Sequence, residues 1–531
     1  MNRLPVLCAA LAGAVLPAQN VFHGNGVPSA YVQNTPGVLG QQLVVGFGSP
    51  TTPLPLAILS VSDGVGPVFV PHPLLGNIGL DLFSPAFQAL TFPLDPNGHG
   101  SAQLLLPPGF PLASDPPLFL QAATFEATGL SISKTVRVEW ANPNAWEPVA
   151  PLSTARGFHT ATALGSGPRD NVTEVLLCGG SSGTFLDPVP SAAAELYSPL
   201  LRSMSPLPTM AIPRSMHAAV RLPDGRVLIT GGITTGGLVT ATCELFDPNV
   251  GAFTAAPSML AARAAHAATP LDDGRVLVTG GAVDWQSLPL AQRWTTILAS
   301  AEVFDPVAGT WSPLPSMATP RFGHTQTLLP DGRVVVFGGF YRNYLQPAQA
   351  MLQPTNVIEV FEPGLPMFVW FLPGGFNGRA LHGASLLSDG TVAISGGFQV
   401  LAGHGVSFLP AADLFVFDPA TGQLQPRGAL PLPLACHTQV PSPGGALIVG
   451  GLAQVAIGFD TSLIDAMPAT AVAYEFNGTG LTLPAAIGTD GFGGIVTPCA
   501  GHTCVPLYDG TFLLHGGFRP VRAEGFVYTP Q

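Results

Sequence analysis

One spacing pattern recurs seven times along the C-terminal part of the chain. Five copies place an arginine three residues before a histidine, and two further copies keep the histidine alone. The arginines are Arg156, Arg214, Arg263, Arg321 and Arg379, and the histidines are His159, His217, His266, His324, His382, His437 and His502. Successive histidines are 49 to 65 residues apart. A repeat of this length indicates an array in which each copy is one supersecondary unit.

Two more markers follow each histidine. A mostly apolar run ends in Gly-Gly, with the first glycine 13 to 20 residues after the histidine, as in DGRVLVTGG. A short segment with an aromatic residue comes next, as in EVFDP. The Asp-Gly dipeptide is typical of a β-hairpin turn, because both turn positions need positive φ. Each unit therefore predicts four antiparallel strands, which is one blade of a β-propeller.

The composition agrees with an all-β chain. Of 531 residues, 63 are glycine and 56 are proline, and only 9% are charged. This argues against long helices, because proline removes a backbone donor and glycine costs helix entropy. The net charge of −12 argues against a nucleic-acid partner. After the N-terminus, no apolar run reaches the ~18 residues of a transmembrane segment.

The two ends of the repeat region predict how the ring closes. Trp146 marks a fourth strand that precedes the first complete unit, and the last unit reaches Tyr528 without a fourth strand of its own. Pairing of these segments would close a seven-bladed ring and remove open sheet edges. We expect this propeller over residues 140–531. Short strands separated by turns predict an antiparallel β-sandwich over residues 20–139, with a packing role rather than an adhesion or carbohydrate-binding role.

The N-terminus predicts export. Residues 1–18 resemble a secretory signal peptide, because Arg3 precedes an apolar run that ends in small residues. We therefore expect a secreted, periplasmic or cell-surface protein. The five cysteines beyond this segment are too few for a disulfide scaffold. Cys499 and Cys504 either close a small disulfide loop or remain buried thiols. A zinc site with His502 is disfavoured, since an alternating strand would send Cys499 and His502 to opposite faces.

The Gly-Gly pair and the aromatic of the third strand resemble the kelch repeat family over residues 146–531. The fold is also similar to that of the galactose oxidase and glyoxal oxidase family, whose copper-radical chemistry uses a Tyr-His dipeptide before a DGR-type turn. The equivalent dipeptides here, beginning with Phe158-His159, contain no Tyr-His. Phenylalanine neither ligates copper nor forms a phenoxyl radical. We therefore expect no metal or other cofactor, with copper disfavoured, and we assign no catalytic residue.

We interpret the seven histidines as structural, because a residue present in every blade usually serves every blade. Candidate binding residues come from loops between the second and third strands, whose lengths vary between units. Their aromatic and charged side chains are typical of interfaces and of sugar stacking. They are Asp284, Trp285, Arg293, Trp294, Tyr341, Arg342, Tyr344, His404, Phe408 and Arg519. The aromatic residues among them could equally be plugs that cover blade edges, and the sequence leaves both interpretations open.

We expect a monomeric binding or interaction module whose partner is a protein segment or an extracellular glycan. The alternative is an enzyme on the same loop face, either an oxidase of the galactose oxidase type or a sugar-modifying enzyme similar to the sialic-acid epimerases built on kelch propellers. An enzyme would need convergent acid and base groups in the central funnel. A binder would instead present an aromatic surface without them.

Overall fold

The computed structural model describes strand backbones between residues 31 and 145 and then most of the chain to residue 529. The continuous stretches from 146 on are 146–164, 174–183, 187–199, 201–285, 294–342, 352–374, 376–400, 408–442, 444–453, 469–470, 472–482, 500–507, 511–518 and 523–529. This part of the chain is nearly all β, with one short 3₁₀ helix, η1 (Thr235–Gly237). It contains no helix with the length and apolar character needed to span a membrane.

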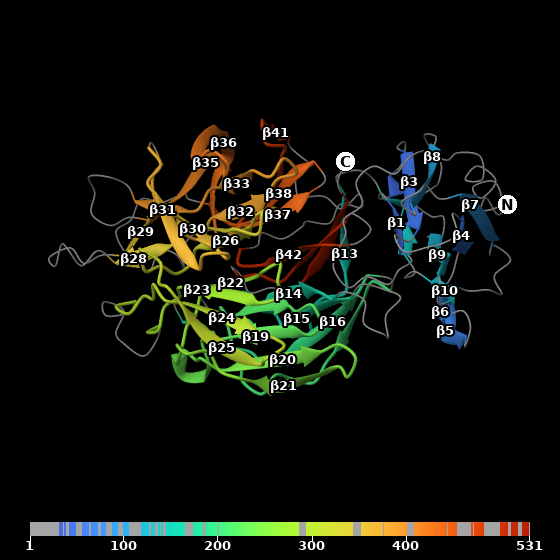
Figure 1. Cartoon of the computed structure of the whole chain (residues 1–531), viewed down its shortest axis with the longest axis horizontal. Helices are drawn as coiled ribbons and strands as arrows, with labels where there is room; N and C mark the ends of the chain where they lie inside the picture. Colours follow the sequence, from blue (N-terminus) through green and yellow to red (C-terminus); the bar gives the residue numbers. More distant parts are fainter. Residues whose placement is uncertain are drawn as a thin grey trace.

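Seven sheets, each built on four antiparallel strands, form the blades that the repeat predicts (Figure 1). Blade 1 contains β14 (Thr160–Ala163), β15 (Val175–Cys178), β16 (Ala194–Ser198) and β17 (Ser203–Pro206). Blade 2 contains β18 (Ala218–Arg221), β19 (Val227–Thr230), β20 (Cys243–Asp247) and β21 (Ala252–Ala256). Blade 3 contains β22 (Ala267–Pro270), β23 (Val276–Thr279), β24 (Ala301–Asp305) and β25 (Thr310–Leu314).

The remaining blades follow the same order. Blade 4 contains β26 (Thr325–Leu328), β27 (Val334–Phe337), β30 (Ile358–Glu362) and β31 (Met367–Phe371). Blade 5 contains β32 (Gly383–Leu386), β33 (Val392–Ser395), β35 (Phe408–Asp418) and β36 (Gln423–Ala435). Blade 6 contains β37 (Thr438–Ser442), β38 (Gly445–Val449), β40 (Ala473–Phe476) and β41 (Leu481–Thr482). Blade 7 contains β42 (Thr503–Pro506), β43 (Phe512–His515), β44 (Gly525–Thr529) and β13 (Ala145–Val149).

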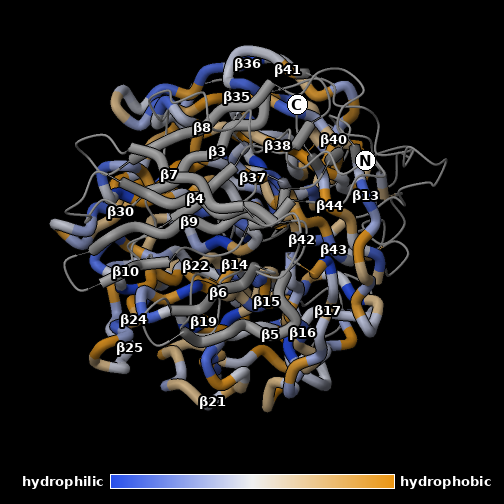
Figure 2. Tube along the Cα trace, turned by 90° about the vertical axis from the view of Figure 1, so that its right-hand side faces the viewer, coloured by the Kyte–Doolittle hydropathy of each residue, from blue (hydrophilic) through white to orange (hydrophobic). Residues whose placement is uncertain are grey.

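The blades form a closed ring. The innermost strand of each blade contacts the innermost strands on both sides, and β14 of blade 1 contacts both β18 and β42. The β13 strand pairs antiparallel with β44, and the two strands lie close together in Figure 2. This pairing places Trp146 opposite Tyr528, with their ring centroids 4.7 Å apart. The two ends of the propeller therefore share one sheet, in the arrangement expected from the sequence.

Burial follows the position of each strand within its blade. Every residue of the second strands β19, β23 and β27 is buried, because these strands pack against neighbouring blades on both faces. Their runs of Val, Ile and Leu suit such a position. Outer strands such as β21 and β25 are largely exposed.

The long insertions between second and third strands build short extra strands at one end of the propeller. In blade 4, β28 (Phe340–Arg342) pairs with β29 (Leu352–Pro354). In blade 5, β34 (Phe398–Val400) pairs with the start of β35. A two-stranded contact between β36 and β39 (Leu452–Ala453) joins blade 5 to blade 6.

The N-terminal strands form separate sheets. One sheet contains β1 (Tyr31–Asn34), β3 (Gln42–Gly48) and β8 (His99–Leu105). A second contains β4 (Leu56–Ser62), β7 (Gln88–Pro93), β9 (Leu118–Glu126), β10 (Gly129–Ile132) and β11 (Val136–Val138). Two strand pairs join β5 (Val65–His72) to β6 (Gly76–Leu80) and β2 (Gly37–Val38) to β12 (Trp140–Ala141). The domain boundaries at 20–139 and 140–531 stay predictions, and the expected signal peptide lies outside the described residues.

Candidate functional site

A ring of seven backbone hydrogen bonds surrounds the propeller axis. The residue before each repeated histidine donates its N–H to the carbonyl of the equivalent residue in the preceding blade, at 2.8 to 3.4 Å. These seven residues, called the axial ring here, are Phe158, Met216, Ala265, Gly323, Leu381, Cys436 and Gly501. The N–H of Phe158 donates to the carbonyl of Gly501, so the ring closes on itself after seven blades.

All seven residues of the axial ring have a left-handed backbone conformation, with φ between 51° and 61°. The five that carry side chains pay roughly 1–2 kcal/mol each for this conformation. The hydrogen bonds on both sides of each residue offset that cost and hold the backbone in place. Because every copy has the same conformation, one residue per blade borders the axis.

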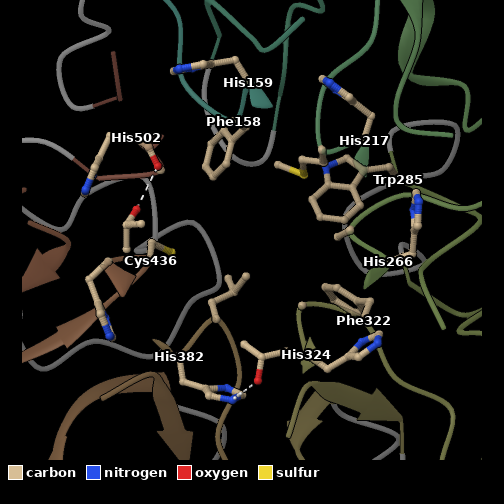
Figure 3. A pocket seen from close by; sticks show the side chains of 18 residues that line it. Phe158, His159, His217, His266, Trp285, Phe322, His324, His382, Cys436 and His502 are labelled. Carbon is tan, nitrogen blue, oxygen red and sulfur yellow. Dashed lines mark hydrogen bonds between the residues drawn. The ribbon is translucent and has the colours of Figure 1, made fainter. Parts of the chain in front are cut away.

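The axial ring lines a pocket of about 300 Å³. Trp285 of blade 3 and Phe322 of blade 4 complete one wall, opposite Phe158 and Cys436 (Figure 3). Among the described residues that line the pocket there is no Asp, Glu, Lys or Arg. The volume is at the lower end of the range for ligand pockets, so it suits one ring or one side chain rather than an extended molecule.

The seven repeated histidines stand around the axial ring, one per blade, and each is at most 8% exposed. In six of them Nε2 lies 2.7 to 3.0 Å from a side-chain hydroxyl oxygen of the preceding blade. Thr438 instead donates to the backbone carbonyl of His502, at 3.0 Å. Each histidine therefore joins two blades. The repeat spacing had not shown that all seven also border one pocket.

The hydroxyl partner comes from one of two neighbouring positions in each blade. Thr160 directly follows a histidine and contacts His217. In blade 2 that position is Ala218, and its cross-strand partner Thr230 contacts His266 instead. Both positions lie on the same face of a strand pair, so either can present a hydroxyl to the next blade. Because either position can carry the hydroxyl, every blade presents one side-chain hydroxyl to the next blade.

Burial makes these histidines neutral. It lowers the pKa of His217, His382 and His502 to about 3 and that of His437 to about 4. Burial, reinforced by the charge of nearby arginines, lowers the pKa of His159, His266 and His324 well below its usual range. The wall of the pocket formed by described residues is therefore uncharged at neutral pH.

Each repeated arginine pairs with an acid on the third strand of its own blade. Arg214 Nη2 donates to Glu244 Oε1 at 2.8 Å, and Nη1 donates to the carbonyl of Gly231 at 2.7 Å. The Glu244 carboxylate also accepts the backbone N–H groups of Ala211 and Ile212. All five arginines are at most 1% exposed. The other pairs are Arg156–Glu195, Arg263–Glu302, Arg321–Glu359 and Arg379–Asp413.

The sequence interpretation missed these acids, although a signal was present. In blades 1 to 4 a glutamate stands two residues before the aromatic residue of the third strand, and all four of these blades carry the arginine. Blade 5 carries the arginine too, and its partner there is Asp413. Two opposite charges that recur together in units of a low-charge chain indicate a buried pair.

The next blade packs directly against each Gly-Gly pair and leaves no space for a side chain there. A side chain at Gly280 would meet the carbonyl oxygen of Arg321 at 2.3 Å and the ring of His324 at 2.8 Å. The N–H of Gly281 donates to the same Arg321 carbonyl at 2.8 Å. The two glycines have φ of +61° and +106°, which favours glycine as well. The Gly-Gly pair of one blade therefore receives the Arg–His turn of the next.

One blade of the propeller matches a known family model. Residues 263–318 match the Kelch motif, and they span blade 3 from Arg263 through its Gly-Gly pair to the end of its fourth strand. Blade 3 therefore carries a match to the Kelch motif. No curated protein matches the chain. Among solved structures, one described as "Structure of YjhT" is similar, with 15% identity and a TM-score of 0.45, over 63% of this chain and 98% of that one.

The propeller buries three of the aromatic loop residues that the sequence singled out for binding. Trp285 is 0%, Trp294 5% and Phe408 7% exposed. They belong to one apolar cluster around the pocket, in which the Trp294 ring lies 5.7 Å from Trp285 and 6.1 Å from Phe322. Trp285 also lines the pocket. Burial therefore favours the plug interpretation for all three, including Trp285 at the wall of the pocket.

Asp284 organises the loop that carries the two tryptophans. Its carboxylate accepts the backbone N–H groups of Thr295, at 2.9 Å, and Thr296, at 3.1 Å. Asp284 thus ties the start of the loop to its end. Tyr341 and Arg342 are half-buried in β28 and do not line the pocket. The other four expected binding residues, Arg293, Tyr344, His404 and Arg519, lie outside the described residues.

Replacing Trp294 with leucine is expected to lower the free energy of unfolding by about 1–2 kcal/mol, because two aromatic contacts are lost while the site stays apolar. Urea denaturation measures the change. Val307→Ala, at a position that is 97% exposed, is the control and should change stability by less than about 0.5 kcal/mol. Equal effects of the two substitutions would show that Trp294 does not act as a plug.

Metal ligands were not found together in the described part of the chain, where no three His, Cys, Asp or Glu side chains are placed to hold an ion. Cys499 lies outside that part. Its pairing with Cys504 therefore stays a prediction.

Proposed function

We propose that this protein is a secreted binding module whose axial pocket receives one uncharged, apolar side chain of a partner protein. The wall of the pocket carries the proposal, because Phe158, Met216, Trp285, Phe322 and Leu381 line it without a charged residue among its described members. Burying a Leu or Phe side chain there would contribute about 1.5–3 kcal/mol. A charged group would lose its hydration without gaining a partner.

A sugar fits this pocket less well than an apolar side chain. Sugar hydroxyls need hydrogen-bond partners, and six of the seven histidine Nε2 atoms at the pocket already contact a hydroxyl of the preceding blade. The ring of Trp285 is buried against Trp294 and Phe322, which reduces the face open for stacking. These observations favour a protein ligand over a glycan.

The enzymatic alternative has less support in the site. Acid–base catalysis needs a group whose pKa lies near the working pH. Burial holds the pKa of the pocket histidines near 3 to 4 where a value is resolved, far from neutrality. The described lining residues include no tyrosine and no carboxylate. Binding is therefore the function that we propose.

Ala265→Met tests the pocket without disturbing the backbone. Met216 occupies the equivalent position of the axial ring with φ of 51°, against 52° for Ala265, so the ring accepts methionine there. The added side chain would fill part of the pocket. Peptides selected from a random library for binding to the natural protein should bind the variant about 10-fold or more weakly in calorimetric titration.

The control is Ala255→Met, on the exposed face of β21 far from the axis. It should leave peptide affinity unchanged. N-acetyl-tryptophanamide and methyl glycosides serve as minimal probes of the two ligand classes. Unaltered peptide binding by Ala265→Met, or binding of the glycosides with no binding of the amide, would contradict the proposal.

A further inference from the structure

We propose that β31, the outermost strand of blade 4, pairs with the same strand of a second copy of this chain about a two-fold axis. The proposal is independent of the axial pocket. It replaces the monomer expected from the sequence with a dimer joined at the rim of the propeller.

The first observation is a concentration of exposed apolar side chains. Five large ones lie within eight residues and are 37% to 73% exposed, and we call them the β31 patch: Leu365, Met367, Val369, Trp370 and Leu372. No charged residue occurs between Glu362 and Arg379. Contiguous apolar surface of this kind marks protein–protein contact sites.

The second observation is an open strand edge. One edge of β31 pairs with β30, and the other pairs with no strand among the described residues. Outer strands of other blades carry features that block edge pairing, such as Pro313 within β25 and Pro426 within β36. The outer strand β21 instead exposes small side chains, Thr254 and Ala255. Sequence MFVWF in β31 has none of these protections.

The sequence of β31 indicates that the partner at its open edge is a second copy of the chain. Antiparallel pairing centred on Val369 would place Val369 opposite itself, Phe368 opposite Trp370 and Met367 opposite Phe371. Every cross-strand pair would then be apolar, which stabilises antiparallel sheets. A two-fold contact uses each open edge once, so assembly stops at the dimer.

The open edge of β31 lies away from the described N-terminal sheets. In Figure 1 the strand lies on the side of the propeller away from β1, β3 and β9 of the N-terminal sheets. The described N-terminal sheets therefore do not cover the open edge of β31.

Sedimentation and light scattering of the purified full-length chain test the proposal. The mass should be twice that of the monomer at high protein concentration and should fall toward the monomer on dilution. Val369→Lys would place two like charges opposite each other at the two-fold axis and should raise the dissociation constant about 100-fold or more. The control, Thr254→Lys, changes the matching position of blade 2, since Thr254 faces Leu245 as Val369 faces Val360.

Hydrogen exchange on the natural protein provides a readout that does not depend on the folding of a variant. The amides of β31 should lose protection on dilution, whereas those of β21 should not change. A monomer at the highest soluble concentration would overturn the proposal. Growth beyond the dimer, or a dimer that Val369→Lys leaves intact, would overturn it as well.

Discussion

Replacing Arg321 with alanine should lower the free energy of unfolding by about 3–5 kcal/mol. The guanidinium and its partner Glu359 are both 0% exposed, so the substitution would leave a buried carboxylate without its counter-charge. It would also remove the donor to the carbonyls of Gly338 and Val357, at 2.9 and 3.0 Å. Urea denaturation followed by tryptophan fluorescence measures the loss.

Arg333→Ala is the matched control, because Arg333 belongs to the same blade and pairs with Asp331 in an exposed turn. Exposed ion pairs contribute at most about 1 kcal/mol, so this variant should be nearly as stable as the natural protein. A loss at Arg321 no larger than that at Arg333 would show that the buried pair does not stabilise the blade. Arg321→Met combined with Glu359→Leu should recover only part of the loss, because the N–H groups of Ala318 and Thr319 would lose their acceptor.

Acidification from pH 7 is expected to unfold the protein cooperatively at about pH 5. Histidine in the unfolded chain titrates near pH 6.5, whereas burial lowers the pKa of His217, His382 and His502 to about 3 in the folded state. Between these values the unfolded state binds more protons. The stability contributed by neutral burial is therefore complete above about pH 6.5 and is lost as the pH falls toward 3.

The expected effect is large because the same group recurs in every blade. Each such histidine lowers the free energy of unfolding by about 1.4 kcal/mol for every pH unit below the pKa of histidine in the unfolded chain. Seven of them acting together would remove about 10 kcal/mol by one pH unit below 6.5, which is comparable to the whole stability of a typical protein.

Circular dichroism and urea denaturation at a series of pH values test this expectation. The variant His437→Gln retains a polar group near Ser395, its present partner at 2.7 Å, and should reduce proton uptake on unfolding by about one. Stability that stays constant between pH 7 and pH 5 would contradict the neutral, buried state of these side chains.

The blade number, the strand order and the closing strand pair were predictable from residue spacing alone. The reason is that each marker meets a local requirement of the backbone, a turn or a close contact, that recurs in every blade. Asp-Gly makes the hairpin turn, and Gly280 and Gly281 leave space for the Arg321 carbonyl of the next blade. Trp146 and Tyr528 belong to incomplete units, so their pairing followed from counting strands.

The candidate site was predictable only in part. Its wall gathers residues from every blade, so Phe158 and Leu381 line one pocket although more than 200 residues separate them. No spacing rule distinguished Trp294, packed inside the apolar cluster, from Trp370, exposed on the rim of blade 4. Short motifs specify the local backbone geometry, and their regular repetition specifies the architecture of the propeller. Exposure and proximity to the axis depend on how blades pack against one another, so they emerge only when the ring is closed.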